Sequence, residues 1–154
     1  MSKLGRDVFI SLAAIGWADG KLDADEADAI VRAALDEGLT LDEISEIEAA
    51  TKAPVTLDFI DRSFMGKDDR LFVYAMAAWI ARIDGQVTPD EVEALGKLGD
   101  LLGVPARPRQ AAEVLAQEIA QADGDKPFRY DLARLRKTIT ERLIEAERAR
   151  LESR

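Results

Sequence analysis

The most apolar stretch of the chain lies near its centre, from Leu71 to Ala81. It contains no charged or strongly polar side chain, so no face of a helix formed here is suited to water. It is also too short to cross a bilayer, which takes about 20 apolar residues. The pattern therefore predicts a buried central helix that ends at Asp84-Gly85, where glycine supplies the left-handed conformation that closes a helix.

Apolar side chains recur at helical spacing through most of the remaining chain, and no convincing two-residue alternation is present. N-cap residues and glycines mark the starts and ends of these stripes. The predicted helices cover residues 4–18, 23–37, 41–52, 56–64, 68–84, 88–102, 109–122 and about 127 to near the C-terminus. The fold class is therefore all-α, with about eight helices, of which the last is long.

Several helix boundaries have specific signals. Asp23 is expected to cap the second helix, and both Thr40–Glu43 and Thr88–Glu91 have the spacing of a capping box. The stretch from Val104 to Pro108 is expected to break the chain before a new helix begins. The apolar stripes predict buried side chains at Ile30, Val31, Ala34, Leu35, Leu41, Ile44, Ile47, Ala111, Leu115, Ile119 and Ala122.

The chain contains an internal repeat at an offset of 65 residues, which places residues 10–40 over residues 75–105. The matches fall on a helix, an Asp-Gly turn, an acidic helix start and a glycine stop, so the chain resembles two copies of one helical hairpin. The identical residues are Ala13, Ile15, Asp19, Gly20, Asp25, Glu26, Ala29 and Gly38 in the first copy, and Ala78, Ile80, Asp84, Gly85, Asp90, Glu91, Ala94 and Gly103 in the second.

Composition narrows the possible chemistry. The 154 residues are 47% hydrophobic and 33% charged, as in a folded domain large enough to bury a core. The sequence has no cysteine and no histidine. These absences exclude disulfides, a thiol nucleophile, the usual zinc sites and a serine–histidine–aspartate triad.

The charge is acidic overall and unevenly distributed. A net charge of −9 argues against nonspecific binding of nucleic acid. Residues 1–125, the predicted repeat-containing helical domain, carry 12 basic and 25 acidic side chains, whereas residues 126–154 carry 9 basic and 5 acidic ones. This basic amphipathic C-terminal helix is expected to fold back with its arginines against the acidic body. The alternative is a face for anionic lipid or an acidic partner.

Each hairpin turn carries the pattern Asp-Gly-x-apolar-x-x-x-Glu, which coincides with the second half of a calcium-binding EF-hand loop. The first half is absent, so a lone turn cannot supply the six to eight oxygens that calcium takes. If the two hairpins pack about a pseudo-twofold axis, Asp19, Glu26, Asp84 and Glu91 can converge on one divalent cation, with calcium favoured over magnesium. No organic cofactor is expected.

Two other interpretations compete with a metal site. Asp-Gly is a common helix-stop turn and the glutamate is a common capping residue, so the pattern is also typical of ordinary helix boundaries. Hydrolytic acid–base work by two of the carboxylates needs a raised pKa beside an apolar wall, for which the sequence gives no sign.

The two hairpins, Trp17-Ala-Asp-Gly-Lys-Leu-Asp-Ala-Asp-Glu26 and Ala81-Arg-Ile-Asp-Gly-Gln-Val-Thr-Pro-Asp-Glu91, resemble the TerB-like family. This family comprises tellurite-resistance TerB proteins and relatives, including the N-terminal region of some membrane-anchored DnaJ-type co-chaperones. The resemblance covers about residues 4–123 and leaves the basic C-terminal helix outside.

The resemblance implies an all-helical, non-enzymatic domain with an acidic cluster for divalent cations and a setting in tellurite and stress resistance, often beside membrane-bound partner proteins. The matching positions are Asp19, Glu26, Asp84 and Glu91. No leader or membrane span is recognised, so a cytoplasmic protein is expected. The main alternative function is a metal-independent helical scaffold that binds other proteins.

Overall fold

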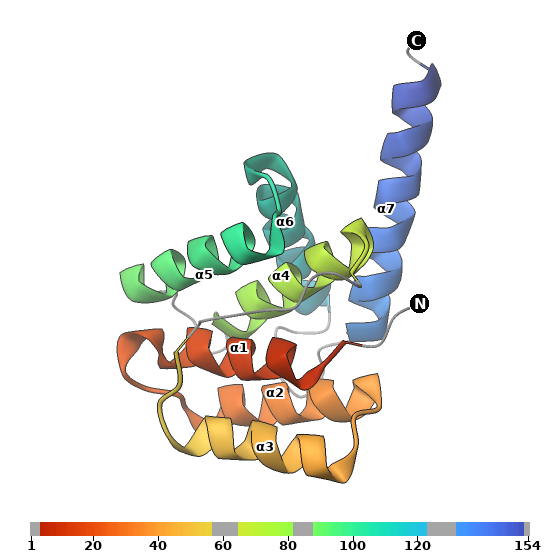
Figure 1. Ribbon diagram of the computed structural model, residues 1–154. Helices are drawn as coiled ribbons and strands as arrows, with labels where there is room; N and C mark the ends of the chain where they lie inside the picture. Colours follow the sequence, from red (N-terminus) through yellow and green to blue (C-terminus); the bar gives the residue numbers. More distant parts are fainter. Residues whose placement is uncertain (1–3, 57–64, 82–87, 123–131, 153–154) are drawn as a thin grey trace.

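The computed structural model describes residues 4–56, 65–81, 88–122 and 132–152, and all regular structure in these ranges is helical. Seven α-helices and one short 3-10 helix, η1, follow one another along this part of the chain (Figure 1). Their bounds are α1 Arg6–Gly16, η1 Trp17–Asp19, α2 Ala24–Glu37, α3 Leu41–Lys52, α4 Lys67–Ala81, α5 Pro89–Leu102, α6 Ala106–Ala122 and α7 Leu132–Glu152. The all-α prediction is confirmed.

The central helix predicted from the apolar stretch is α4. Every residue from Phe72 to Ala81 is buried, and α4 contacts α1, α2, α5, α6 and α7. A helix that is apolar on every side needs neighbours on every side, and these five helices supply them. The helices α1, α2 and α3 form one end of the body, and α7 starts beside that end and extends away from it, so that its last turns project beyond the other helices (Figure 1).

Local sequence signals set the helix boundaries as predicted. The side chain of Asp23 accepts a hydrogen bond from the Glu26 backbone N–H at 2.9 Å, and Thr40 and Thr88 both form complete capping boxes. Gly20, Gly38 and Gly103 end η1, α2 and α5 in the left-handed conformation, with φ of 88°, 87° and 71°. A side chain with a Cβ is strained there, which explains the use of glycine.

Some predicted boundaries differ from the structure. The expected break after α5 is present but shorter than predicted, because α6 begins at Ala106 rather than Arg109 and includes Pro108. Proline is tolerated in the first turn of a helix because the backbone N–H groups there have no partner inside the helix. Of the eight predicted helices, the one over residues 56–64 lies outside the described residues except for its first residue. The turn Asp84-Gly85, at which the central helix is predicted to end, also lies outside them.

The predicted core is correct in part. Five of the predicted positions are buried, namely Ile30, Ala34, Ile44, Ile47 and Ile119, and Val31 and Leu115 are partly buried, while the side chain of Ala122 lies outside the described residues. Leu35 and Leu41 are 53% and 82% exposed, and Ala111 is also exposed. Each was assigned to the core because it fits an apolar stripe, but the neighbouring helices cover a narrower face. On α6, Ala112 and Ala116 are buried in place of Ala111.

The helices α2 and α5 have matching bounds. Both have 14 residues, and each bound of α5 lies 65 residues after the corresponding bound of α2. Their C-terminal hydrogen bonds also correspond: Leu39 N–H donates to the Ala34 carbonyl, and Val104 N–H donates to the Gly99 carbonyl. The ends of α1 and α4, and the starts of α3 and α6, are offset by the same 65 residues.

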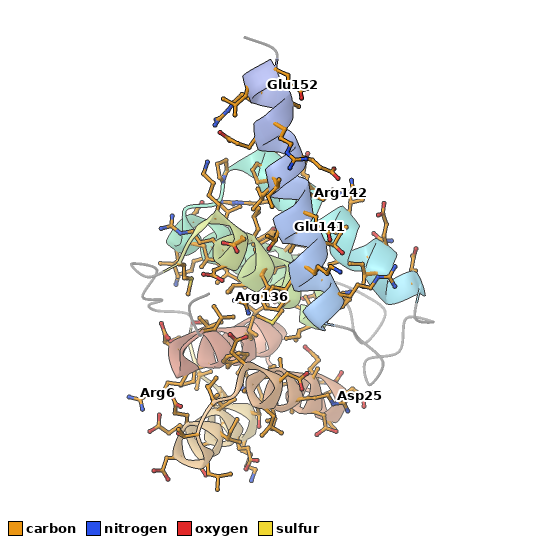
Figure 2. The ribbon with its side chains drawn as sticks, turned by 90° about the vertical axis from the view of Figure 1, so that its right-hand side faces the viewer. Arg6, Asp25, Arg136, Glu141, Arg142 and Glu152 are labelled. Atoms are coloured by element: carbon orange, nitrogen blue, oxygen red, sulfur yellow. The ribbon has the colours of Figure 1, made fainter. Side chains whose placement is uncertain are left out.

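One arginine joins α7 to two other helices. The guanidinium of Arg136 lies 2.8 Å from a carboxylate oxygen of Glu37 in α2 and 2.7 Å from one of Asp69 in α4. It also lies 4.7 Å from the centre of the Phe72 ring, a favourable position for a cation over an aromatic face. The side chains of Arg136, Glu37 and Asp69 are all largely shielded from water. The arginine therefore stabilises the two carboxylate charges, and the carboxylates stabilise the charge of the arginine. Arg136 lies where α7 meets the body, whereas Glu152 lies on its projecting end (Figure 2).

We expect Arg136→Ala to lower the free energy of unfolding by about 3–5 kcal/mol, because it leaves two shielded carboxylates without their cation. Urea denaturation followed by circular dichroism measures this change. Arg150→Ala is the control, since its partner Glu147 is exposed on the same helix and such pairs contribute about 0–1 kcal/mol. Equal effects of the two substitutions would contradict a structural role for Arg136.

The contact between α4 and α6 includes a buried phenol. The Tyr74 hydroxyl donates a hydrogen bond to Glu113 Oε1 at 2.8 Å, and Tyr74 is 3% exposed. Burial, followed by the hydrogen bond to Glu113 and the charge of that carboxylate, raises the pKa of Tyr74 well above its ordinary value. The folded protein therefore holds the neutral phenol more strongly than the unfolded chain does.

Tyr74 is expected to make stability fall at alkaline pH. Its contribution is fully present below the unfolded pKa of 10.0 and is lost as the pH rises from there toward the higher folded pKa. Urea unfolding at a series of pH values from neutral to strongly alkaline tests this. Tyr74→Phe should lose less stability over the alkaline range than the unmutated protein, and parallel losses would contradict the assignment.

Candidate metal centre

The first glutamate of the predicted site, Glu26, lies in the first turn of α2. Its backbone N–H is bound by the capping Asp23, and its side chain extends toward α1, where the residue is only 4% exposed. Glycine at position 16 permits this approach: a Cβ added there would lie 3.1 Å from Glu26 Oε2 and would overlap the end of the Leu22 side chain. Gly16 was not singled out in the sequence, although it interrupts the apolar stripe one turn before Asp19-Gly20.

The second glutamate, Glu91, occupies the corresponding position in α5. Its Oε1 accepts a hydrogen bond from the Thr88 backbone N–H at 3.2 Å, and its own N–H donates to Thr88 Oγ1 at 3.1 Å. Glu91 is 1% exposed. Its carboxylate thus performs the capping function that the sequence suggested, and it does so in the interior of the protein.

The end of the first predicted hairpin helix and the helix that carries Glu91 lie close together at this end of the fold. The short helix η1, which contains Asp19, contacts α5, and α1 also contacts α5. Figure 1 shows the first hairpin turn at the same edge of the body as the start of α5. The side chain of Asp19 and the whole of Asp84 lie outside the described residues. The structure therefore places two of the four predicted ligands.

Glu26 and Glu91 are buried, whereas the other acidic residues at the starts of α2, α3 and α5 are not. Asp25 and Asp90 directly precede them and are exposed. Glu43, which forms the capping box of α3, is only half-buried, and its hydrogen bonds with Thr40 are exposed. Helix capping alone therefore does not require a glutamate to be buried.

The chemistry of these donors suits a hard cation. Carboxylate oxygens are the ligands that calcium and magnesium prefer, and burial of a carboxylate is costly unless hydrogen bonds or an opposite charge offset it. Within the described ranges, no group of three or more acidic side chains is close enough to hold a metal ion. A complete coordination shell therefore needs Asp19, Asp84, backbone carbonyls or water.

Trp17 lies next to the first turn. Its indole N–H donates to the Ala50 carbonyl of α3 at 2.9 Å, and the side chain is half-buried against the core. The other tryptophan, Trp79, is 1% exposed within α4. Trp79 therefore belongs to the core, whereas Trp17 links the turn after α1 to α3.

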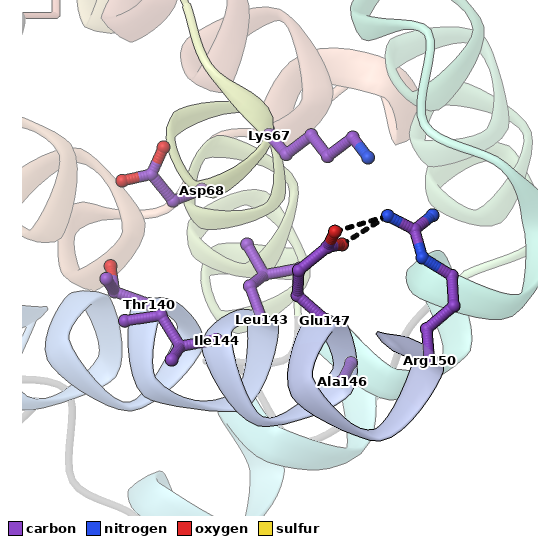
Figure 3. Close-up of a pocket in the computed structure, with 8 residues that line it drawn as sticks. All are labelled: Lys67, Asp68, Thr140, Leu143, Ile144, Ala146, Glu147 and Arg150. Carbon is purple, nitrogen blue, oxygen red and sulfur yellow. Dashed lines mark hydrogen bonds and ion pairs between the residues drawn. The ribbon is translucent and has the colours of Figure 1, made fainter. Parts of the chain in front are cut away.

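Two surface hollows lie beside α7. One of about 450 Å³ lies between the start of α4, which contributes Lys67 and Asp68, and α7, which contributes Thr140 and Ile144 (Figure 3). The exposed pair Glu147–Arg150 closes one side of it. A larger hollow, of about 770 Å³, lies between α6 and α7. The residues that line these hollows include neither Glu26 nor Glu91.

Comparison with protein-family models, curated proteins and solved structures found no match to this chain. Among the described helices, none is both long enough and apolar enough to span a membrane.

Gly16→Ala is expected to destabilise the protein by about 1 kcal/mol, because the new methyl group displaces Leu22 and presses on the Glu26 carboxylate. Gly96→Ala is the matched control: it lies inside α5 with nothing within 4 Å of the added Cβ, so it should stabilise by about 0.5–1 kcal/mol. Urea unfolding of both variants measures the difference. Stabilisation by both substitutions would mean that Glu26 is not held closely against α1.

Proposed function

We propose that this chain is a non-enzymatic, TerB-like stress-response accessory protein that binds a divalent cation through Asp19, Glu26, Asp84 and Glu91 and interacts with a protein partner. The observation that carries the proposal is the burial of Glu26 and Glu91, at 4% and 1% exposure, at equivalent positions of the sequence repeat. Their acidic neighbours Asp25 and Asp90 are exposed.

The proposed site uses the two hairpins as related halves about a pseudo-twofold axis. The 65-residue offset between the bounds of α2 and α5, and the contact of η1 with α5, support this arrangement. Each half supplies an aspartate from its Asp-Gly turn and a glutamate from the next helix. Four carboxylates brought together repel one another, and a dication removes that repulsion. Calcium is favoured over magnesium because it tolerates irregular oxygen coordination.

The proposed setting is the cytoplasm, in tellurite or other stress resistance, with a partner protein that can itself be membrane-bound. This part rests on the TerB-like resemblance of residues 4–123 alone. An excess of acidic over basic side chains, net −9, supports a protein partner over nucleic acid.

A metal-independent interaction scaffold is the second candidate, and the capping box of Glu91 favours it. Hydrogen bonds with Thr88 already give this carboxylate a structural role. In this case the acidic turns are helix boundaries, and the projecting α7 recruits other proteins.

Thermal unfolding of metal-stripped protein, with and without millimolar calcium or magnesium, distinguishes the two candidates. A cation present at 100 times its dissociation constant stabilises the folded state by about 2.7 kcal/mol, which should raise the midpoint by several degrees. The rise should disappear in Glu26→Gln/Glu91→Gln. Trp17 beside the first turn provides a fluorescence signal for the same titration.

Asp25→Asn/Asp90→Asn is the matched control, because it removes the same amount of charge from the same two helix starts but alters exposed side chains. It should keep the calcium effect. Loss of the effect in both double variants would indicate general electrostatic attraction, and superimposable curves for the unmutated protein with and without cations would favour the scaffold.

A further inference from the structure

The hollow between α6 and α7 is an apolar groove on the surface. Leu71 of α4, Val114 and Leu115 of α6, and Leu143 and Ala146 of α7 line it. Val114 is 55% exposed, and Leu115 and Leu143 are only partly buried. An exposed apolar groove bounded by charged residues is typical of a surface that another helix covers.

Four residues of α6 form a single stripe along this groove. Arg107, Ala111, Val114 and Glu118 follow one another at intervals of four, three and four residues, and all four line the groove. This spacing is the seam of a helix that packs lengthwise against another helix. Arg107 and Glu118 are both exposed, and neither forms an ion pair within the described residues.

The stripe is complementary to itself when it is reversed. If a second α6 lies antiparallel to the first, with Ala111 beside Val114 of the second copy, Arg107 faces Glu118 of the second copy. Each of these pairs forms one layer of the interface, and the two-fold axis generates a second copy of each layer. In every layer Ala111 packs against the larger Val114, or Arg107 pairs with the oppositely charged Glu118. At the edge of the stripe, Leu115 then faces Pro108 of the second copy. Leu115 and Pro108 both line the groove.

The other wall of the groove fits the same arrangement. The partly buried Leu143 and the exposed Ala146 of α7 face the space that a second α6 would enter. Two copies of the pair α6–α7 would then form four packed helices, in which each copy covers the groove of the other. Helices in such bundles pack at the small and apolar positions that this groove presents.

We propose that this chain forms a two-fold homodimer in which α6 packs antiparallel on α6 of the second copy, within the groove bounded by α7. Charge complementarity selects a second copy over an anionic peptide or lipid. An anionic ligand would be attracted by Arg107 and Arg142 but repelled by Glu118, which lies in the same stripe as Arg107, whereas a second copy pairs Arg107 with Glu118 in both directions. The interface is isologous, which is the commonest form of protein dimer. This proposal is independent of cation binding.

The first test is a charge exchange followed by analytical ultracentrifugation from micromolar to near-millimolar protein. Arg107→Glu alone and Glu118→Arg alone should each raise the dissociation constant of the dimer at least about tenfold, because each creates two like-charged layers. The double variant Arg107→Glu/Glu118→Arg should restore dimerisation, because it has the same composition as the unmutated chain and opposite charges in both layers. An equimolar mixture of the two single variants should also associate.

Arg32→Glu and Glu48→Arg are matched controls, since both residues are exposed on helices that do not line the groove. They should leave the dissociation constant unchanged. Circular dichroism of each variant checks that α6 remains folded. A monomer at every concentration, or a double variant no better than the single variants, would overturn the proposal.

The absence of native cysteine permits a second test of the antiparallel register. Chains carrying Ala111→Cys and chains carrying Val114→Cys are mixed and oxidised under mild conditions. The disulfide between one chain of each kind should form faster than a disulfide between two identical chains, because only the mixed pair lies in one layer. Equal rates for all three products would contradict the register. The control is a pair of cysteines introduced on α3, and disulfides at α6 that form no faster than disulfides at α3 would contradict the interface.

Discussion

Burial of α4 on every side is the constraint on which the rest of the fold depends. Ten consecutive residues from Phe72 to Ala81 are removed from water, and this requires cover in all directions around a single helix. Five other helices contact α4, and they come from positions before and after it in the chain. The helices α1, α2 and α5 therefore all pack against one helix, and η1 contacts α5 at the end of the body where Glu26 and Glu91 are buried.

Sequence reasoning was most successful where a boundary depends on nearby residues. The caps at Asp23, Thr40 and Thr88 were predicted because a side chain and a backbone N–H three residues away interact within one turn. Gly38 and Gly103 were predicted because the left-handed conformation that ends a helix strains any residue with a Cβ, and glycine has none. Such interactions do not depend on the rest of the fold.

Predictions that depend on distant residues were less successful. Leu41 fits the apolar stripe of its helix but is 82% exposed, because no other described helix covers that side. The position of Arg136 between α2 and α4 could not be deduced from helical spacing, since its partners Glu37 and Asp69 lie 99 and 67 residues away. For the proposed metal site, the sequence singled out Glu26 and Glu91 but could not indicate that Gly16 makes room for the Glu26 side chain.

The ion pairs of Arg136 have a consequence for the order in which the chain can complete its fold. Glu37 and Asp69 belong to parts of the chain that leave the ribosome well before Arg136 does. Until α7 arrives, these two carboxylates lie in neighbouring helices without the cation that neutralises them, and they repel one another. The nascent body should therefore stay loosely packed at the junction of α2 and α4 and become compact only when the last helix docks. On this argument, the docking of α7 would complete the fold during synthesis.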